Sequence, residues 1–144
     1  MASHWDLVED EETETWLGRD RTPYALDSCS DVKVLLAEPS YLDEIAQLHQ
    51  QAFSDAEETL EASRRYITEA LKDSDGLLYI LLKEAQVIGV CTVDLSGNNN
   101  YLYGLAVAEA YRGQGYGSYL AKSVVNQLIA QNDKSFQIAV KIAI

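Results

Sequence analysis

The stretch YLYGLAVAEAYRGQGYGSYLAKSVVNQLI, residues 101–129, decides how the rest of the chain is arranged. It has the pattern of a buried strand, a glycine-rich turn and an amphipathic helix. Gly113, Gly115 and Gly117 stand at alternate positions after the apolar run that ends at Val107. Glycine has no Cβ atom, so the backbone of this turn can approach a ligand closely.

The turn and the helix that follows it together predict a phosphate site. The first N–H groups of a helix have no partner within the helix, and the helix dipole adds partial positive charge there. Arg112 adds a cation with a planar set of donors. A Walker A loop is excluded because no glycine is followed by Lys-Ser/Thr at the required spacing, and the dinucleotide fingerprint fails because Ser118 stands where its third glycine belongs.

The pattern that remains is R-x-x-G-x-G, residues 112–117, after a strand that ends in Leu105-Ala106-Val107. This segment resembles the acetyl-CoA motif of the GNAT N-acetyltransferase superfamily. The resemblance implies acetyl-CoA as co-substrate and no metal. It also implies cofactor contacts from the motif positions, which are Leu105, Ala106, Val107, Arg112, Gly113, Gln114, Gly115, Tyr116, Gly117 and Ser118.

Hydrophobic periodicity predicts the other elements. They are a strand over Val32–Ala37, a helix with Ser40 as N-cap and Leu42, Ile45, Ala46, His49 and Phe53 on one face, a helix over Ala56–Lys72, strands over Leu77–Leu82 and Val87–Leu95 joined by a turn at Lys83–Ala85, and a strand over Phe136–Ile142. This order resembles the GNAT order over about residues 32–140. The expected fold class is therefore α+β, a mixed, mostly antiparallel twisted sheet flanked by helices, with a splayed central strand pair.

Gly104 interrupts the strand Tyr101–Val107, and glycine inside a strand often marks a bulge. In the family such a bulge helps to part this strand from its neighbour, and the pantetheine arm of the cofactor enters the opening. By resemblance, the backbone of Leu105, Ala106 and Val107 would bond the arm, and one N–H would polarise the thioester carbonyl.

Composition limits which binding partners and which cellular compartment are expected for this chain. The net charge is −12, so nucleic acid is an unexpected partner, whereas a cationic amine would be attracted. Solubility alone is an equally simple reason for the acidity. No apolar run is long enough to span a bilayer, so no membrane association is expected. Cys29 and Cys91 suggest neither a disulfide framework nor a metal site, and we therefore expect a cytoplasmic location.

Residues 1–31 are predicted to form an acidic N-terminal arm, apart from a GNAT-like domain over residues 32–144. The charged run Glu9–Glu14 and the break at Pro23 before Tyr24–Leu26 favour a plain extension or an ordered arm. An alternative is open, because Thr13–Asp27 resembles the last helix, glycine turn and strand of a GNAT domain. The arm would then be the tail of a preceding domain or a strand supplied to a neighbour.

Relatives continue beyond the last predicted strand through a further helix and strands, so the domain is expected to be C-terminally incomplete. That helix often carries a tyrosine that protonates the departing CoA thiolate, and no equivalent can be assigned here. A neighbouring chain that completes the sheet, as in a homodimer, is one expectation, since unpaired strand edges favour pairing.

The expected function is transfer of an acetyl group from acetyl-CoA to a primary amine of a small molecule or peptide. The alternative is a catalytically incomplete acyl-CoA-binding or regulatory module. The general base that takes a proton from the amine is not assigned. Candidates are Tyr101, Tyr103, Asp94 and Glu109, and a structural role would also explain each of them. By resemblance the acceptor lies near Phe53, Ser54 and Asp55, and His49 is expected to be a structural core residue.

Overall fold

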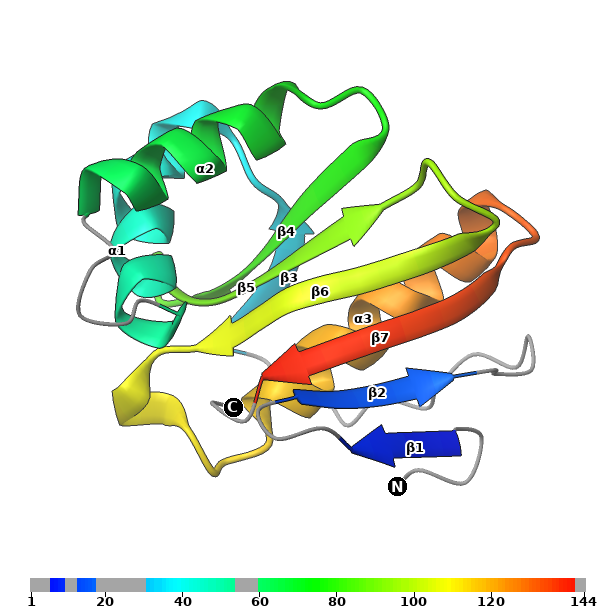
Figure 1. Ribbon diagram of the computed structural model, residues 1–144. Helices are drawn as coiled ribbons and strands as arrows, with labels where there is room; N and C mark the ends of the chain where they lie inside the picture. Colours follow the sequence, from blue (N-terminus) through cyan, green and yellow to red (C-terminus); the bar gives the residue numbers. More distant parts are fainter. Residues whose placement is uncertain (1–5, 10–12, 18–30, 54–59, 142–144) are drawn as a thin grey trace.

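The computed structural model describes residues 6–9, 13–17, 31–53 and 60–141. Seven strands and three α-helices make up this part of the chain (Figure 1). In chain order they are β1 (Asp6–Glu9), β2 (Thr13–Leu17), β3 (Val32–Leu36), α1 (Leu42–Phe53), α2 (Leu60–Lys72), β4 (Gly76–Lys83), β5 (Gln86–Asp94), β6 (Asn99–Val107), α3 (Tyr116–Gln131) and β7 (Ser135–Lys141). Short 3-10 turns cover Pro39–Tyr41 and Glu109–Tyr111.

All the strands belong to one sheet, in the order β1-β2-β7-β6-β5-β4-β3. Neighbouring strands are antiparallel except for β6 and β7, which run in the same direction. A parallel pair needs a crossover connection, and α3 provides it. The expected mixed, mostly antiparallel sheet is confirmed.

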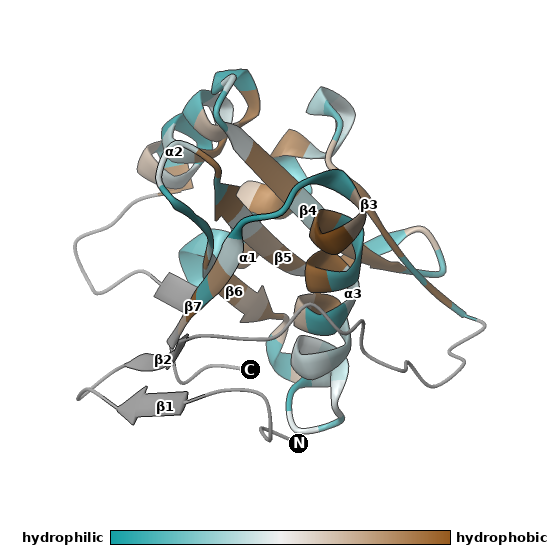
Figure 2. Cartoon of the chain, turned by 90° about the vertical axis from the view of Figure 1, so that its right-hand side faces the viewer, coloured by the Kyte–Doolittle hydropathy of each residue, from teal (hydrophilic) through white to brown (hydrophobic). Residues whose placement is uncertain are grey.

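The helices cover both faces of the sheet, and β4 shows how the sequence divides its side chains between them. Leu78, Ile80 and Leu82 join the core beneath α1 and α2. Tyr79 and Leu81 join the core beneath α3. Figure 2 shows the hydrophobic strands between the α1–α2 pair and α3. Because both faces are buried, the strand is a continuous apolar run rather than an alternating one.

The predicted elements from residue 32 onward are present, with local differences. Ser40 lies inside the 3-10 turn and does not immediately precede α1, so the predicted cap is wrong. The hairpin turn between β4 and β5 uses Glu84 and Ala85, both at positive φ. The expected start of α2 at Ala56 lies outside the described residues, and Leu60, the first described residue of α2, is 40% exposed.

The N-terminal strands were not predicted. β1 pairs with β2, and β2 pairs antiparallel with β7, so the arm extends the sheet beyond β7. The backbone of Thr13–Leu17 is a strand, although the resemblance to a closing GNAT segment assigned a helix there. Tyr24–Leu26, predicted to be extended, lies outside the described residues.

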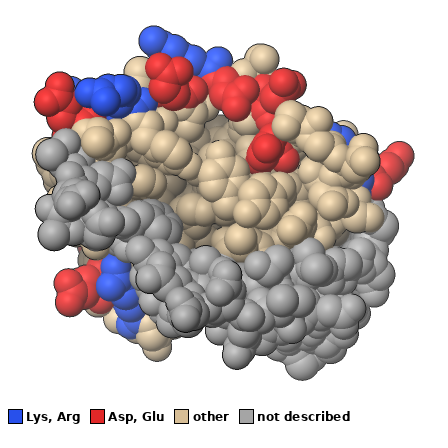
Figure 3. All heavy atoms as spheres, viewed as in Figure 1, with Lys and Arg blue, Asp and Glu red and all other residues tan. Residues whose placement is uncertain are grey.

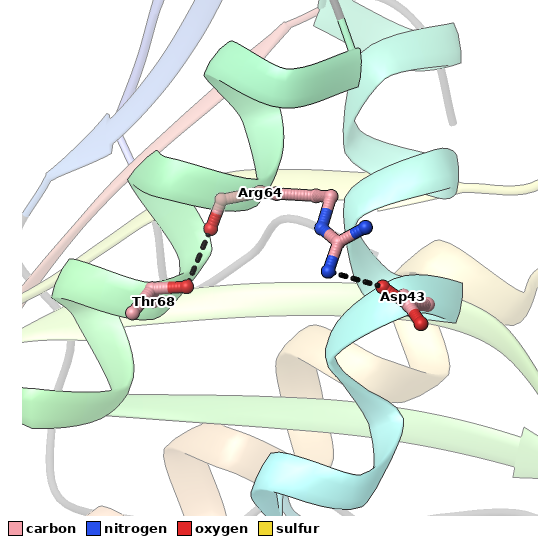
Figure 4. A network of polar contacts seen from close by, with 3 residues as sticks. All are labelled: Asp43, Arg64 and Thr68. Carbon is pink, nitrogen blue, oxygen red and sulfur yellow. Dashed lines mark hydrogen bonds and ion pairs between the residues drawn. The ribbon is translucent and has the colours of Figure 1, made fainter.

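An ion pair links α1 and α2 in addition to their shared core, and a side-chain hydrogen bond within α2 lies beside it. Arg64 Nη2 lies 3.3 Å from Asp43 Oδ1, and the Thr68 hydroxyl donates to the Arg64 carbonyl oxygen at 2.7 Å (Figure 4). Both charged side chains are more than half exposed, so the pair contributes about 1 kcal/mol at most. Among the described helices, none is long and apolar enough to cross a membrane.

Candidate functional site

The parallel pairing of β6 with β7 covers only one end of β6. The register runs from Asn99↔Ser135 to Leu102↔Ile138. From there to the end of β6, the described residues show pairing on the β5 side alone. The two parallel strands are thus joined at one end and parted at the other, as the predicted splayed pair requires.

Gly104 lies where the pairing ends. Its φ is +63°, and the register between β5 and β6 shifts between Val90 and Thr92, opposite this residue. The predicted bulge is confirmed. A Cβ atom at Gly104 would lie 3.4 Å from the Thr92 hydroxyl, so the positive φ favours glycine more than the available space does.

The backbone beyond the bulge alternates between two directions. The Ala108 N–H donates to the Ile88 carbonyl oxygen at 2.8 Å, and Ala106 pairs with Val90. The backbone groups of Ala106 therefore face β5, and those of Leu105 and Val107 face the opening beside β7. Of the three residues that the motif assigns to the arm, Leu105 and Val107 have the suitable direction.

The loop after β6 is held by its own side chains. Arg112 Nε donates to the Val107 carbonyl oxygen at 2.9 Å, and Gln114 Nε2 donates to the Ala110 carbonyl oxygen at 3.2 Å. The rings of Tyr111 and Tyr116 meet edge to face, 6.0 Å apart. A loop ordered before its ligand arrives loses less entropy on binding.

Gly113 and Gly115 form a cradle in front of α3. Their φ angles are +75° and +89°, and a Cβ atom built on either would meet no protein atom within 4 Å. Gly115 is the N-cap of α3, and its carbonyl oxygen accepts the Tyr119 N–H at 3.0 Å. The first turn of α3 contains no acidic residue. This shape and charge fit a phosphate group.

The position of α3 is fixed by the core. Gly117, Leu120, Val124 and Leu128 are buried along the helix side that packs on the sheet. The N-terminus of α3 is thereby held at the open end of the β6–β7 pair. Ser118, on the other side of the first turn, is exposed.

Lys83 is a further candidate residue for the phosphate site, and it was not predicted from the sequence. Its ammonium pairs with the Asp31 carboxylate, and Nζ lies 6.0 Å from the centroid of the Tyr116 ring. The hydrogen bond to Asp31 is the main cause that raises the pKa of Lys83. A cation therefore stands beside the first residue of α3. No local signal reveals it, because these residues are far apart in the chain.

The candidate bases differ in their surroundings. Asp94 Oδ1 accepts hydrogen bonds from the Ser96 N–H and hydroxyl at 2.9 and 2.7 Å, and these bonds lower the pKa of Asp94. Burial is the main cause that raises the pKa of Tyr103, whose ring stacks on Tyr101 at 5.4 Å. Glu109 is exposed in the 3-10 turn. Tyr103 is the candidate that lines a cavity, beside Tyr66 of α2.

His49 is buried, and its Nδ1 lies 3.3 Å from the Ser63 hydroxyl oxygen, as expected for a structural histidine. Cys91 is buried as a free thiol, and burial raises its pKa to about 12. Within the described ranges, His, Cys, Asp and Glu form no group able to hold a metal ion. The side chain of Phe53, and Ser54 and Asp55 entirely, lie outside the description.

Residues 42–142 match the model of the family described as "Acetyltransferase (GNAT) family". No curated protein matches the sequence. Among solved structures, a GCN5-related N-acetyltransferase from Sphaerobacter thermophilus aligns with 96% of this chain and 44% of its own at 15% identity, with a TM-score of 0.72. This chain thus spans less than half the length of that protein.

Two shorter structures are also similar. A predicted acetyltransferase from Clostridium acetobutylicum, solved with acetyl-CoA, aligns with 77% of this chain and 82% of its own at 12% identity and a TM-score of 0.61. An aminoglycoside acetyltransferase from an uncultured soil metagenomic sample aligns with 75% of each chain at 18% identity and a TM-score of 0.58. At these identities the likeness is one of fold. The family model, however, covers more than two thirds of the sequence, and the chain belongs to the GNAT family of acetyltransferases.

Proposed function

We propose that this chain binds acetyl-CoA in the loop Arg112–Ser118 and transfers the acetyl group to a primary amine of a small molecule or peptide. One observation carries the proposal. The open cradle of Gly113 and Gly115 leads into the N-terminus of α3 beside the unpaired side of β6. A phosphate site and an unpaired strand edge together suit a ligand with a pyrophosphate and an amide-bearing arm.

In this proposal the loop N–H groups and Arg112 hold the pyrophosphate, and the backbone of Leu105 and Val107 aligns the arm. The amine nitrogen attacks the thioester carbonyl carbon, which forms the N–C bond. An N–H of β6 stabilises the negative charge that develops on the carbonyl oxygen. The C–S bond then breaks, the thiolate takes up a proton, and the nitrogen loses one to solvent or a base.

An amine acceptor is supported by the acidity of the chain, with a net charge of −12. One solved structure of similar fold is that of an aminoglycoside acetyltransferase, which also supports an amine acceptor. Acceptor identity depends on the residues around the amine, and those differ between proteins of one fold.

Binding is tested first, by titrating acetyl-CoA into the chain in a calorimeter and by thermal unfolding. A ligand at 100 times its dissociation constant should stabilise the fold by about 2.7 kcal/mol. We expect Gly115→Val to abolish binding, because the new side chain would occupy the cradle and strain a φ of +89°. Gly97→Val is the matched control, since Gly97 also faces open space but lies in another loop. Near-wild-type affinity in folded Gly115→Val would disprove the loop assignment.

Turnover is tested by measuring CoA release with a panel of amines, polyamines and peptide N-termini. An enzyme releases CoA with at least one of them and yields the acetylated amine by mass spectrometry. Binding of acetyl-CoA without turnover on any member of a broad panel would instead identify an acyl-CoA-binding module.

A further inference from the structure

A cavity of about 420 Å³ opens between α2 and β6, on the sheet face opposite α3. It is lined by Tyr66, Glu69, Ala70, Lys72, Asp73 and Tyr103. Figure 3 shows a hollow of uncharged residues below α2, with both acidic and basic side chains along its upper rim. None of these lining residues belongs to the loop Arg112–Ser118, so this space is distinct from the phosphate cradle.

Two tyrosine rings in this cavity are held in place by other aromatic side chains. The Tyr66 ring stacks on His49 at 4.7 Å, and the Tyr103 ring stacks on Tyr101 at 5.4 Å. His49 is itself buried between α1 and α2. Rings that are fixed in this way present preformed π faces, which attract organic cations.

The charges around the Tyr103 hydroxyl also favour a cation. Burial raises the pKa of Tyr103 most, and the Tyr66 hydroxyl and the carboxylates of Asp94 and Asp73 raise it further. The phenol therefore stays protonated at neutral pH, and two carboxylates lie within electrostatic range of it. Glu69 lies in the last part of α2, and Asp73 directly follows the helix end at Lys72, where its Oδ1 accepts the Asp75 N–H at 2.9 Å; both residues line the cavity. Lys72 is the one cation in the cavity lining, and its side chain is exposed.

The cavity lies close to where the reaction is proposed to occur. Tyr103 precedes Leu105 by two residues of β6, so their Cα atoms are at most about 7 Å apart. Gly104 between them forms the bulge. The cavity therefore reaches the part of β6 that directly precedes Leu105.

We propose that this cavity is the acceptor site and that it selects an aliphatic diamine or polyamine. The proposal rests on the proposed function. One amino group reaches the thioester beside Leu105 and is acetylated by the step described above. A second ammonium is held by Glu69 and Asp73 against the rings of Tyr66 and Tyr103.

The test compares putrescine with n-butylamine, which has the same carbon chain and lacks the second ammonium. Each is titrated calorimetrically into the full chain saturated with CoA, at low salt. We expect putrescine to bind at least about tenfold more tightly, because hydrogen bonds to charged groups are among the strong ones. In the CoA-release assay the same preference should appear in kcat/KM.

Glu69→Gln should remove most of this preference and leave acetyl-CoA affinity unchanged. Glu61→Gln is the matched control, because Glu61 is exposed on the same helix and does not line the cavity. Tyr103→Phe should weaken putrescine binding, since the ring remains but the hydroxyl is lost. Equal affinity for the two amines, or equal effects of Glu69→Gln and Glu61→Gln, would overturn the acceptor site. Failure to bind acetyl-CoA would instead overturn the proposed function.

Discussion

At the scale of single residues, Arg112 links the strand to the loop. The sequence presents it as a cation at the mouth of a phosphate site, and the structure adds a hydrogen bond from Nε to the Val107 carbonyl oxygen. A guanidinium has five N–H donors, so this bond leaves others for phosphate oxygens. The arginine therefore fixes the end of β6 and the loop relative to each other.

Arg112→Lys should lower acetyl-CoA affinity by about tenfold or more, although the charge is kept. Lysine is a compact point charge on a flexible stem and does not reproduce the planar set of donors. Calorimetric titration measures the effect. Lys122→Arg, a charge-preserving change on the partly exposed side of α3, is the control. A lysine variant with unchanged affinity would show that only the charge of Arg112 matters.

The residue-level features that could be predicted are those with local causes. The bulge at Gly104 and the ligand loop with Gly113 and Gly115 could be predicted, because each of these glycines occupies a position where the backbone needs positive φ. The pairing of Lys83 with Asp31 beside Tyr116 could not be predicted, because it depends on how β4 and α3 pack together. The stacking of His49 on Tyr66 is likewise a product of tertiary packing.

At the scale of elements, side-chain hydrogen bonds form a clasp at the closed end of the β6–β7 pair, between Asn100 and Asn132. The side-chain amides of Asn100 and Asn132 donate to each other's oxygen atoms, both at 2.9 Å. Asn132 Oδ1 also accepts the Lys134 N–H at 2.9 Å, and the Lys134 ammonium donates to the Leu95 carbonyl oxygen. These contacts connect the start of β6 to the segment that joins α3 to β7.

Asn100→Ala should lower the free energy of unfolding by about 1–3 kcal/mol, because it removes the buried amide of Asn100 and leaves the half-buried amide of Asn132 without this partner. Urea unfolding followed by circular dichroism measures the change. Asn98→Ala removes a nearby exposed amide and should have little effect. Equal stabilities of these two variants would show that the amide pair is not a significant clasp.

The elements that periodicity identified are those with a dominant apolar pattern, such as β4, β5 and α3. β1 and β2 were not predicted, because the charged run Glu9–Glu14 has the composition of a solvated segment. Asp6–Glu9 and Thr13–Leu17 are strands because they pair with each other and because Thr13–Leu17 pairs with β7, a tertiary effect that overrides local propensity.

At the scale of the whole molecule, the N-terminal hairpin determines which edges of the sheet are covered. β7 is paired on one side with β6 and on the other with β2 of the same chain. The homodimer expected from an unfinished sheet stays a prediction. It can be tested at the outer edge of β7, which β2 covers in this chain.

Deletion of residues 1–17 should expose the outer edge of β7. We expect the shortened chain to be less stable and to self-associate, since an unpaired strand edge is a template for another chain. Size-exclusion chromatography with light scattering measures association, and urea unfolding measures stability. The undeleted chain is the reference. A monomer with unaltered stability would mean that the hairpin contributes little to the sheet.

The pairing of β2 with β7 has a consequence for the order in which the molecule forms during translation. A ribosome makes the N-terminal hairpin long before β7, and an isolated two-stranded hairpin is marginally stable in water. Contacts between residues distant in sequence also form slowly, because a large loop must close first. The earliest strands of the described chain would therefore be among the last to take their places, after the strands and α3 that frame the cofactor loop have folded.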